Sequence, residues 1–201
     1  MMTTMRDGHQ SGRRERKKAA TRAAIVEAAH ELFLERGFDT VSVREIADRA
    51  DVSPTTVFAY FPQKEALAFG DEDRRHERLV AAVAGRPPGT SISAALKAHY
   101  VAEISAFGSE PQRSVLALME QTPALVEYAE RMWFRHEDAL NAAITKEFGL
   151  TEPTDEIRFY VRFALQIQLN ATRDTDPVST IDAGFRLLDE GWVRYQGGVK
   201  G

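Results

Sequence analysis

The sequence predicts an all-α protein of about nine helices, and three observations indicate that fold class. Apolar residues recur at helical spacing through most of the chain, residues that cap or stop helices separate these segments, and no segment shows a convincing strand pattern. The expected helices span roughly residues 14–36, 42–49, 54–60, 64–85, 91–107, 112–121, 124–148, 155–171 and 177–195.

Two helix starts lie close together in the segment TVSVREIADRADVSPTTVFAYFPQKE, residues 40–65. Ser42 and Glu45 have the spacing of a capping box, in which the serine hydroxyl accepts from the Glu45 backbone N–H and the Glu45 carboxylate accepts from the Ser42 amide. Ser53 with Pro54 forms a second start, a side-chain cap followed by a proline at the first helical position. Two short helices joined so tightly are typical of a helix-turn-helix, whose second helix enters a DNA groove.

The composition excludes several classes of protein. The chain of 201 residues has no cysteine, which excludes disulfides, thiolate chemistry and cysteine-based zinc sites and fits a reducing cytoplasm. No apolar run approaches the roughly 18 residues of a membrane span, and no apolar signal-peptide core follows the N-terminal basic residues. We therefore expect a cytoplasmic protein without a membrane partner, a cofactor or a bound metal.

Three regions are expected along the chain: a disordered N-terminal arm (residues 1–12), a helix-turn-helix domain (13–63) and a larger helical domain (64–201). The helix-turn-helix domain begins with RRERKK, which holds five positive charges and one negative. Charge alone fits a solvated helix start as well as phosphate binding, but the neighbouring two-helix motif favours phosphate. The predicted phosphate contacts here are Arg13, Arg14, Lys17 and Lys18.

The segment AAHELFLERGFDTVSVREIADRADVSPTTVFAYFPQKEAL, residues 28–67, resembles the DNA-binding region of the TetR-type (tetracycline-repressor-like) bacterial transcriptional regulators. The residues that carry the resemblance are Phe33, Gly37, Phe38, Ile46, Ala47, Val52, Ser53, Thr56, Tyr60, Phe61, Lys64, Glu65 and Leu67. Many members have threonine in place of Val41 and tyrosine in place of Phe58, so a hydroxyl that could reach phosphate is absent at both positions. For residues 68–201 the resemblance rests on helix order and implies a domain for ligand binding and dimerisation.

The resemblance implies that helix 54–60 lies in the major groove of double-stranded DNA. Its exposed face is expected to present Pro54, Thr55, Ala59 and Tyr60 to base edges and phosphates. The positions that look like backbone contacts are Thr40, Ser42, Thr56, Tyr60 and Lys64, and the capping residue Ser53 completes the predicted DNA-binding set. The alternative for Thr56 and Tyr60 is a purely local hydrogen bond. Val57, Phe58 and Phe61 are expected in the core.

The last two helices carry more apolar surface than one contact within the chain requires. Ile181, Phe185, Leu188, Trp192 and Tyr195 follow heptad-like steps, and the preceding helix places Tyr160 and Ile167 on one side and Phe159 and Phe163 nearer another. In the family these helices form a four-helix bundle with their symmetry mates. The predicted homodimer interface comprises Tyr160, Ile167, Ile181, Phe185, Leu188 and Trp192, and packing of the seam inside one chain is the alternative.

Polar residues on otherwise apolar helical stripes predict a small-molecule site. The predicted ligand-binding set is Leu96, His99, Tyr100, Glu103, Phe107, Met132, Trp133 and His136. The alternatives are histidines that merely satisfy the core, a metal site that includes His76, and an acid–base pair of His99 with Glu103 or His136. The metal ligands would lack close spacing, and no nucleophile elbow, phosphate loop or HExxH motif accompanies the histidines.

These features lead to one interpretation of the whole chain. We expect a ligand-responsive, homodimeric DNA-binding repressor, not an enzyme, that releases a roughly palindromic operator when a mostly apolar small molecule binds. An enzyme built on the helical core and a DNA-binding dimer without an effector are the two alternatives.

Overall fold

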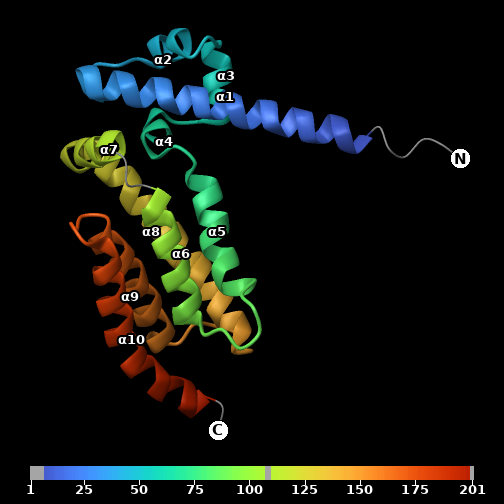
Figure 1. The fold of residues 1–201 in the computed structure, drawn as a ribbon, viewed down its shortest axis with the longest axis vertical. Coiled ribbons are helices and arrows are strands. Elements are labelled where there is room, and N and C mark those ends of the chain that lie inside the picture. Colours follow the sequence, from blue (N-terminus) through green and yellow to red (C-terminus); the bar gives the residue numbers. More distant parts are fainter. Residues whose placement is uncertain (1–6, 107–109, 200–201) are drawn as a thin grey trace, which may run out of the picture. The chain divides into compact units, whose positions relative to one another are not determined.

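The chain folds into α-helices in a computed structural model that describes residues 7–106 and 110–199, with side chains described for 12–105 and 114–190 (Figure 1). This part of the chain has ten helices and no strand. They are α1 (Asp7–Arg36), α2 (Val43–Arg49), α3 (Pro54–Tyr60), α4 (Lys64–Phe69), α5 (Glu72–Ala84), α6 (Ile92–Ala106), α7 (Glu110–Gln121), α8 (Pro123–Glu147), α9 (Asp155–Ala171) and α10 (Pro177–Val199). The predicted all-α class is confirmed.

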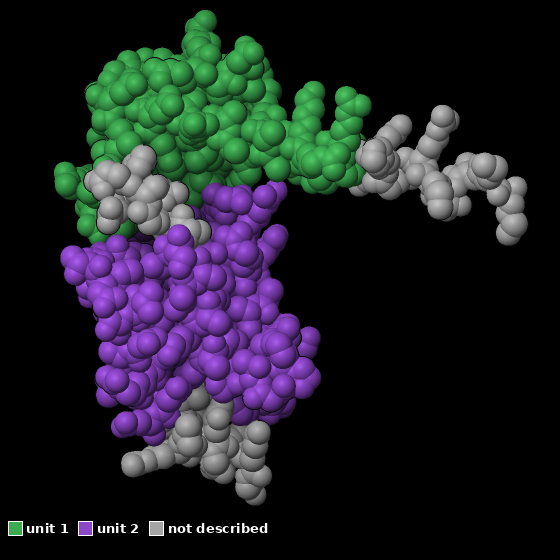
Figure 2. Space-filling view, in the orientation of Figure 1, with its two compact units in different colours: residues 1–70, 113–128 green, residues 71–112, 129–201 purple. Residues whose placement is uncertain are grey.

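The helices group into two compact units, coloured separately in Figure 2. Unit 1 comprises residues 1–70 and 113–128, and unit 2 comprises residues 71–112 and 129–201. Helix α4 therefore packs with the helix-turn-helix, although Lys64 onward was expected to belong to the C-terminal domain.

Helix α1 buries one stripe and ends where a glycine permits it. Ile25, Leu32 and Phe33 are almost completely buried, and Gly37 has φ of 81°, a left-handed conformation that favours glycine at a helix end. The start differs from expectation, because α1 begins at Asp7 and residues 7–12 are helical rather than part of a disordered arm. The apolar periodicity used to place the start is absent from this polar segment, so it could not reveal the extra turns. Residues 1–6 lie outside the described residues.

The two short helices have the predicted caps. The Ser42 Oγ accepts from the Glu45 N–H at 3.2 Å and the Ser42 N–H donates to Glu45 Oε2 at 2.8 Å, which completes the capping box. The Ser53 Oγ accepts from the Thr56 N–H at 3.1 Å, and Pro54 occupies the first turn of α3. Both predicted helix starts are therefore confirmed.

The single helix predicted over residues 64–85 is wrong, because two helices, α4 and α5, occupy this segment. Gly70 has φ of 62° and ψ of −112°, a conformation open to glycine but strained for residues with a side chain. A Cβ at this position would also lie 3.3 Å from Val26 Cγ1. An isolated glycine is tolerated in helices, so its identity alone did not reveal the break.

Unit 2 is a bundle of α5, α6, the later part of α8, α9 and α10 around one apolar core. Its fully buried members include Leu96, Tyr100, Leu140 and Val161. Helices α9 and α10 pack so closely that a Cβ at Gly184 would lie 2.6 Å from Ile167 Cγ1.

The predicted dimer interface is largely a seam within one chain, which is the alternative left open above. Tyr160, Ile181 and Phe185 are at most 2% exposed and belong to the core of unit 2. Ile167 and Leu188 are half-buried against that core, and the side chain of Trp192 lies outside the described residues. A heptad-like spacing shows that a helix has a packing stripe but does not distinguish a partner in the same chain from one in another.

Candidate nucleic-acid interface and buried polar cluster

The exposed face of α3 is the candidate reading surface. Pro54, Thr55 and Ala59 are exposed as predicted, and Tyr60 is half-buried. Phe58 was expected in the core but is 50% exposed, because Val57 and Phe61, four residues apart, take the buried side of the helix. Counting from Val57 would have placed Phe58 about 100° away, on the open face. An aromatic ring is thus added to the candidate reading surface.

Several predicted DNA-contacting hydroxyls already have local partners. The Thr40 Oγ1 donates to the Arg36 carbonyl at 2.6 Å and so satisfies the end of α1. The Ser42 Oγ donates to Glu45 Oε2 at 2.7 Å, and the Ser53 and Thr56 hydroxyls lie 2.8 Å apart. The pKa of Glu45 is lowered to about 2 by its hydrogen bonds from the Ser42 backbone and side chain and from Arg36. These residues shape the two helix starts whether or not DNA is bound.

Lys64 is held within unit 1 rather than projecting freely. Its Nζ donates to the Phe38 carbonyl at 2.6 Å and lies 4.1 Å from the centroid of the Phe38 ring. Burial lowers the pKa of Lys64. The ammonium group has two further N–H donors, so a phosphate contact would be additional to a structural one.

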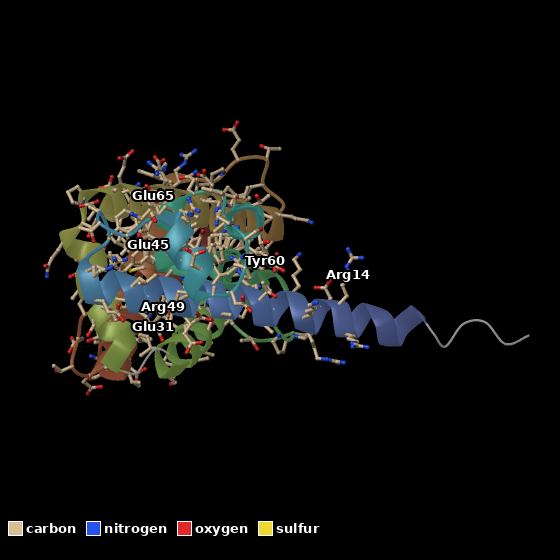
Figure 3. All side chains as sticks on the ribbon, turned by 90° about the horizontal axis from the view of Figure 1, so that it is seen from above. Arg14, Glu31, Glu45, Arg49, Tyr60 and Glu65 are labelled. Atoms are coloured by element: carbon tan, nitrogen blue, oxygen red, sulfur yellow. The ribbon has the colours of Figure 1, made fainter. Side chains whose placement is uncertain are left out.

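The basic cluster at 13–18 lies on an exposed part of α1. Arg13, Arg14, Lys17 and Lys18 are all exposed, and Figure 3 shows Arg14 on the part of α1 that continues past α2 and α3. Because these side chains stand on a helix, they form a row of cations rather than a flexible tail. Such a row could neutralise phosphates and release counterions.

Arg22 is a positioning residue that the sequence reasoning missed. Its guanidinium donates to the Tyr60 carbonyl and to the Gly70 carbonyl, each at 3.1 Å, and lies 4.2 Å from the centroid of the Phe61 ring. It therefore ties α1 to the ends of both α3 and α4. No local motif predicts a contact between residues 22 and 70, and only the folded backbone brings these groups together.

Ion pairs on the surface also connect α1 with α2. Arg49 pairs with Glu31 at 2.9 Å and with Glu35 at 3.4 Å, and Arg36 pairs with Glu45 at 2.9 Å. The side chains of Glu31, Glu45 and Arg49 are labelled in Figure 3. Exposed pairs of this kind contribute little each, so the buried stripe of α1 remains the main anchor of α2.

A second candidate site is a buried polar cluster of α5 and α8 inside unit 2, which we define as His76, Trp133 and His136, with Tyr100 of α6 in the same core. The His136 ring lies 5.0 Å from that of His76 and 5.6 Å, edge-on, from that of Trp133. Among the described residues, neither nitrogen of His136, nor Nδ1 of His76, nor the Tyr100 hydroxyl has a hydrogen-bond partner. Buried polar atoms are normally satisfied, so four orphaned atoms in one core call for a ligand or for water.

The carboxylates around this cluster are paired with arginines. Glu72 pairs with Arg135, and Glu103 accepts from Arg78 Nε at 2.9 Å. Burial, reinforced by His76 and Arg135, lowers the pKa of His136 to about 4. Burial also lowers the pKa of His99. His136 is therefore a neutral imidazole at pH 7, able to donate one hydrogen bond and accept another.

Comparisons with known proteins concern the helix-turn-helix region and the fold. Residues 25–69 match the profile of the family described as bacterial regulatory proteins, tetR family. The regulator TcmR of Streptomyces glaucescens is 31% identical over 129 residues, 60% of this chain and 57% of that protein. The chain thus spans little more than half of that relative's length.

Solved structures extend the likeness over most of the chain. The SmeT–triclosan complex has a TM-score of 0.59 at 17% identity and covers 86% of this chain and 91% of its own. FadR of Bacillus subtilis, solved with stearoyl-CoA, has a TM-score of 0.57 at 19% identity, and the match covers 83% of this chain and 96% of FadR. Residues 25–69 therefore match the TetR family, and the fold of the whole chain is TetR-like. Its TetR-type head is unit 1, where the profile match lies.

The predicted ligand-binding residues have different surroundings. Leu96 and Tyr100 are fully buried in the core, and His99, Met132 and Trp133 are half-buried. Glu103 and His136 are buried, and Phe107 lies outside the described residues. The sequence suggested His76 only as a metal ligand. However, Glu72, His76, Leu79 and Val83 follow one stripe of α5, and that spacing indicates that His76 faces the interior of unit 2.

Two further features are absent from the described part of the chain. Among the described side chains, those of residues 12–105 and 114–190, no group of three or more histidine or acidic residues is placed to hold a metal ion. Within residues 7–106 and 110–199 no helix is both long and apolar enough to cross a membrane.

Proposed function

We propose that this protein is a homodimeric TetR-type transcriptional repressor that binds a roughly palindromic operator and releases it when a mostly apolar small molecule binds unit 2. The observation that carries the proposal is a set of buried polar atoms of His76, Tyr100 and His136 that lack a hydrogen-bond partner, although His136 Nε2 lies 3.9 Å from Glu72 Oε1. Apolar surroundings with a few unsatisfied polar groups are what an effector of this type needs. Two proteins of the same fold, SmeT and FadR, have been solved with small molecules bound.

The proposed signal passes along α8. This helix carries His136 in the buried polar cluster and, two turns earlier, Tyr128, whose ring lies 4.9 Å from that of Phe69 in α4. Arg22 in turn ties the end of α4 to the end of α3 through the Gly70 and Tyr60 carbonyls. A ligand that favours one position of α8 over another would thereby favour one position of α3, and linkage requires it to change DNA affinity by the same differential free energy.

The enzyme alternative gains little from the geometry. Glu103 is paired with Arg78, and the lowered pKa of His99 leaves it a poor candidate for an acid with a carboxylate partner. The proposed repressor needs no catalytic residue.

Two variants of unit 1 should distinguish base recognition from phosphate binding. Thr55→Ala should relax base preference at one operator position by about 1–3 kcal/mol, because Thr55 lies exposed on α3. Arg14→Gln should weaken binding to all DNA sequences alike. It should also lower the slope of log affinity against log salt by about 0.9. Arg14 suits this test better than Lys64, whose ammonium also holds the Phe38 carbonyl.

The measurement is a salt titration of binding to the operator and to single-base variants, after operator selection from random DNA. Lys97→Gln serves as the control, since Lys97 pairs with Asp182 in unit 2. Loss of specificity in Arg14→Gln, or an altered salt slope in Thr55→Ala, would contradict the assignments.

The effector site should respond to His136. A library of apolar compounds is screened for those that both raise the melting temperature and release the operator. His136→Ala should weaken the binding of such a compound at least tenfold, because about one hydrogen bond in a buried site is lost. Operator affinity should stay within about twofold of the wild type. Phe134→Ala is the matched control, because Phe134 lies on the same helix but is 59% exposed. If no compound does both, the dimer without an effector is the better account.

A further inference from the structure

A hollow of about 690 Å³ lies in unit 2 at the C-terminal end of α8, apart from the buried polar cluster. The end of α8, the segment that connects α8 with α9, and the start of α9 line this hollow. Gly149 takes φ of 68°, and the Leu150 N–H donates back to the Thr145 carbonyl at 3.1 Å, so the helix closes with a left-handed cap. Arg158, one turn into α9, also lines the hollow.

Two side chains that line the hollow carry unsatisfied atoms. Asn141 is 9% exposed and Thr145 is 5% exposed, and both lie on one stripe of α8, four residues apart. Neither Asn141 Oδ1 nor Thr145 Oγ1 has a hydrogen-bond partner, and both atoms are shielded from solvent. A half-turn of the amide, or a change of the threonine rotamer, would offer these groups to a molecule in the hollow. Polar side chains in such a place are costly unless something binds them.

The charges around the hollow indicate the class of ligand. Lys146 and Arg158 supply positive charge, and Arg158 keeps N–H donors beyond the one given to Asp155 at 2.9 Å. Asp138 supplies one negative charge on the same wall. Asn141 Oδ1 accepts only and therefore requires a donor. A carboxylate facing the cations and an ammonium facing Asp138 would pair with these charges, and after a half-turn of the amide the ammonium can also donate to Asn141 Oδ1.

We propose that this hollow is a second small-molecule site and that it binds an amino-acid-like zwitterion. The site is independent of the effector proposed above, because its lining does not include His76, Tyr100 or His136 and its ligand is charged rather than apolar. Asn141 and Thr145 select the ligand by hydrogen bonding, while Lys146, Arg158 and Asp138 read its two charges.

The test uses the whole chain labelled with ¹⁵N and follows the side-chain amide of Asn141, assigned by its absence in Asn141→Leu. The probe is an equimolar mixture of the twenty common amino acids, and the control is acetate with methylamine at equal concentration. We expect the amino acids to shift the Asn141 signal saturably and the control mixture to leave it in place. No shift, or the same shift with the control, would overturn the proposal.

Two variants separate ligand binding from a structural role. Asn141→Leu and Thr145→Val should each weaken binding of the amino acids at least tenfold, measured by calorimetry, while the melting temperature stays equal or rises because an unsatisfied buried group is removed. Asn170→Leu is the matched control, since Asn170 is exposed and its Oδ1 accepts from Gln166. A lowered melting temperature in both variants with unchanged binding would show that the two residues only support the fold. Loss of the dimer in both would show that a second copy covers the hollow, and would also overturn the proposal.

Discussion

Phe185→Glu should unfold unit 2. Phe185 is 2% exposed, and its ring lies 5.7 Å from that of Tyr100 in the core. Removing a buried phenylalanine costs about 3–5 kcal/mol, and an unpaired carboxylate in its place adds a desolvation penalty. Because whole domains are stable by only about 5–15 kcal/mol, most of the stability should be lost.

Urea unfolding followed by circular dichroism measures this effect. Leu187→Glu is the matched control, because Leu187 lies two residues further along α10 and is 77% exposed. Leu187→Glu should unfold at nearly the wild-type urea concentration. A folded, monomeric Phe185→Glu would instead restore the dimer interface that the heptad-like seam predicted.

The head could be predicted from sequence because its determinants are local. The capping box of Ser42 with Glu45, the cap of Ser53 with Pro54, and Gly37 at the end of α1 each act within a few residues. Such signals fix where a helix begins and ends wherever the rest of the chain lies.

The features that sequence could not supply depend on contacts between distant segments. Arg22 reaches residues 60 and 70, and Arg78 neutralises Glu103, which had been considered as a ligand anchor. Gly70 breaks a helix only because its backbone takes a conformation that glycine tolerates. Helical spacing found His136 as an outlier on an apolar stripe, but its ring contact with His76 depends on the fold that brings these two residues of α5 and α8 together.

The same limit applies to the predicted dimer interface. Both faces of α9 carry large apolar residues, and their spacing does not show which face is buried within the chain. The structure buries Tyr160 and leaves Phe159 and Phe163 exposed, at 60% and 55%, with their rings stacked 6.3 Å apart. The exposed face of α9 is therefore the better candidate for contact with a second copy, because soluble proteins rarely leave large apolar patches uncovered.

Phe163→Glu should consequently dissociate the proposed dimer while unit 2 stays folded. Around a twofold axis the substitution places two carboxylates in one apolar interface, where charge is poorly solvated. Sedimentation should show monomers at concentrations where the wild type is dimeric. Ala81→Glu, an exposed change on α5, is the control and should remain dimeric.

Phe163→Glu should have a larger effect on operator binding. A dimer that engages two half-sites gains about 10²–10⁴ in affinity over a single head, because the second contact is intramolecular. Phe163→Glu should lose that factor on the full operator. It should bind an isolated half-site as tightly as one wild-type head does, because α3 and the cations of α1 are unchanged. Equal loss on half-site and full site would place the defect in the head, and an intact dimer with wild-type operator affinity would place the interface away from Phe163.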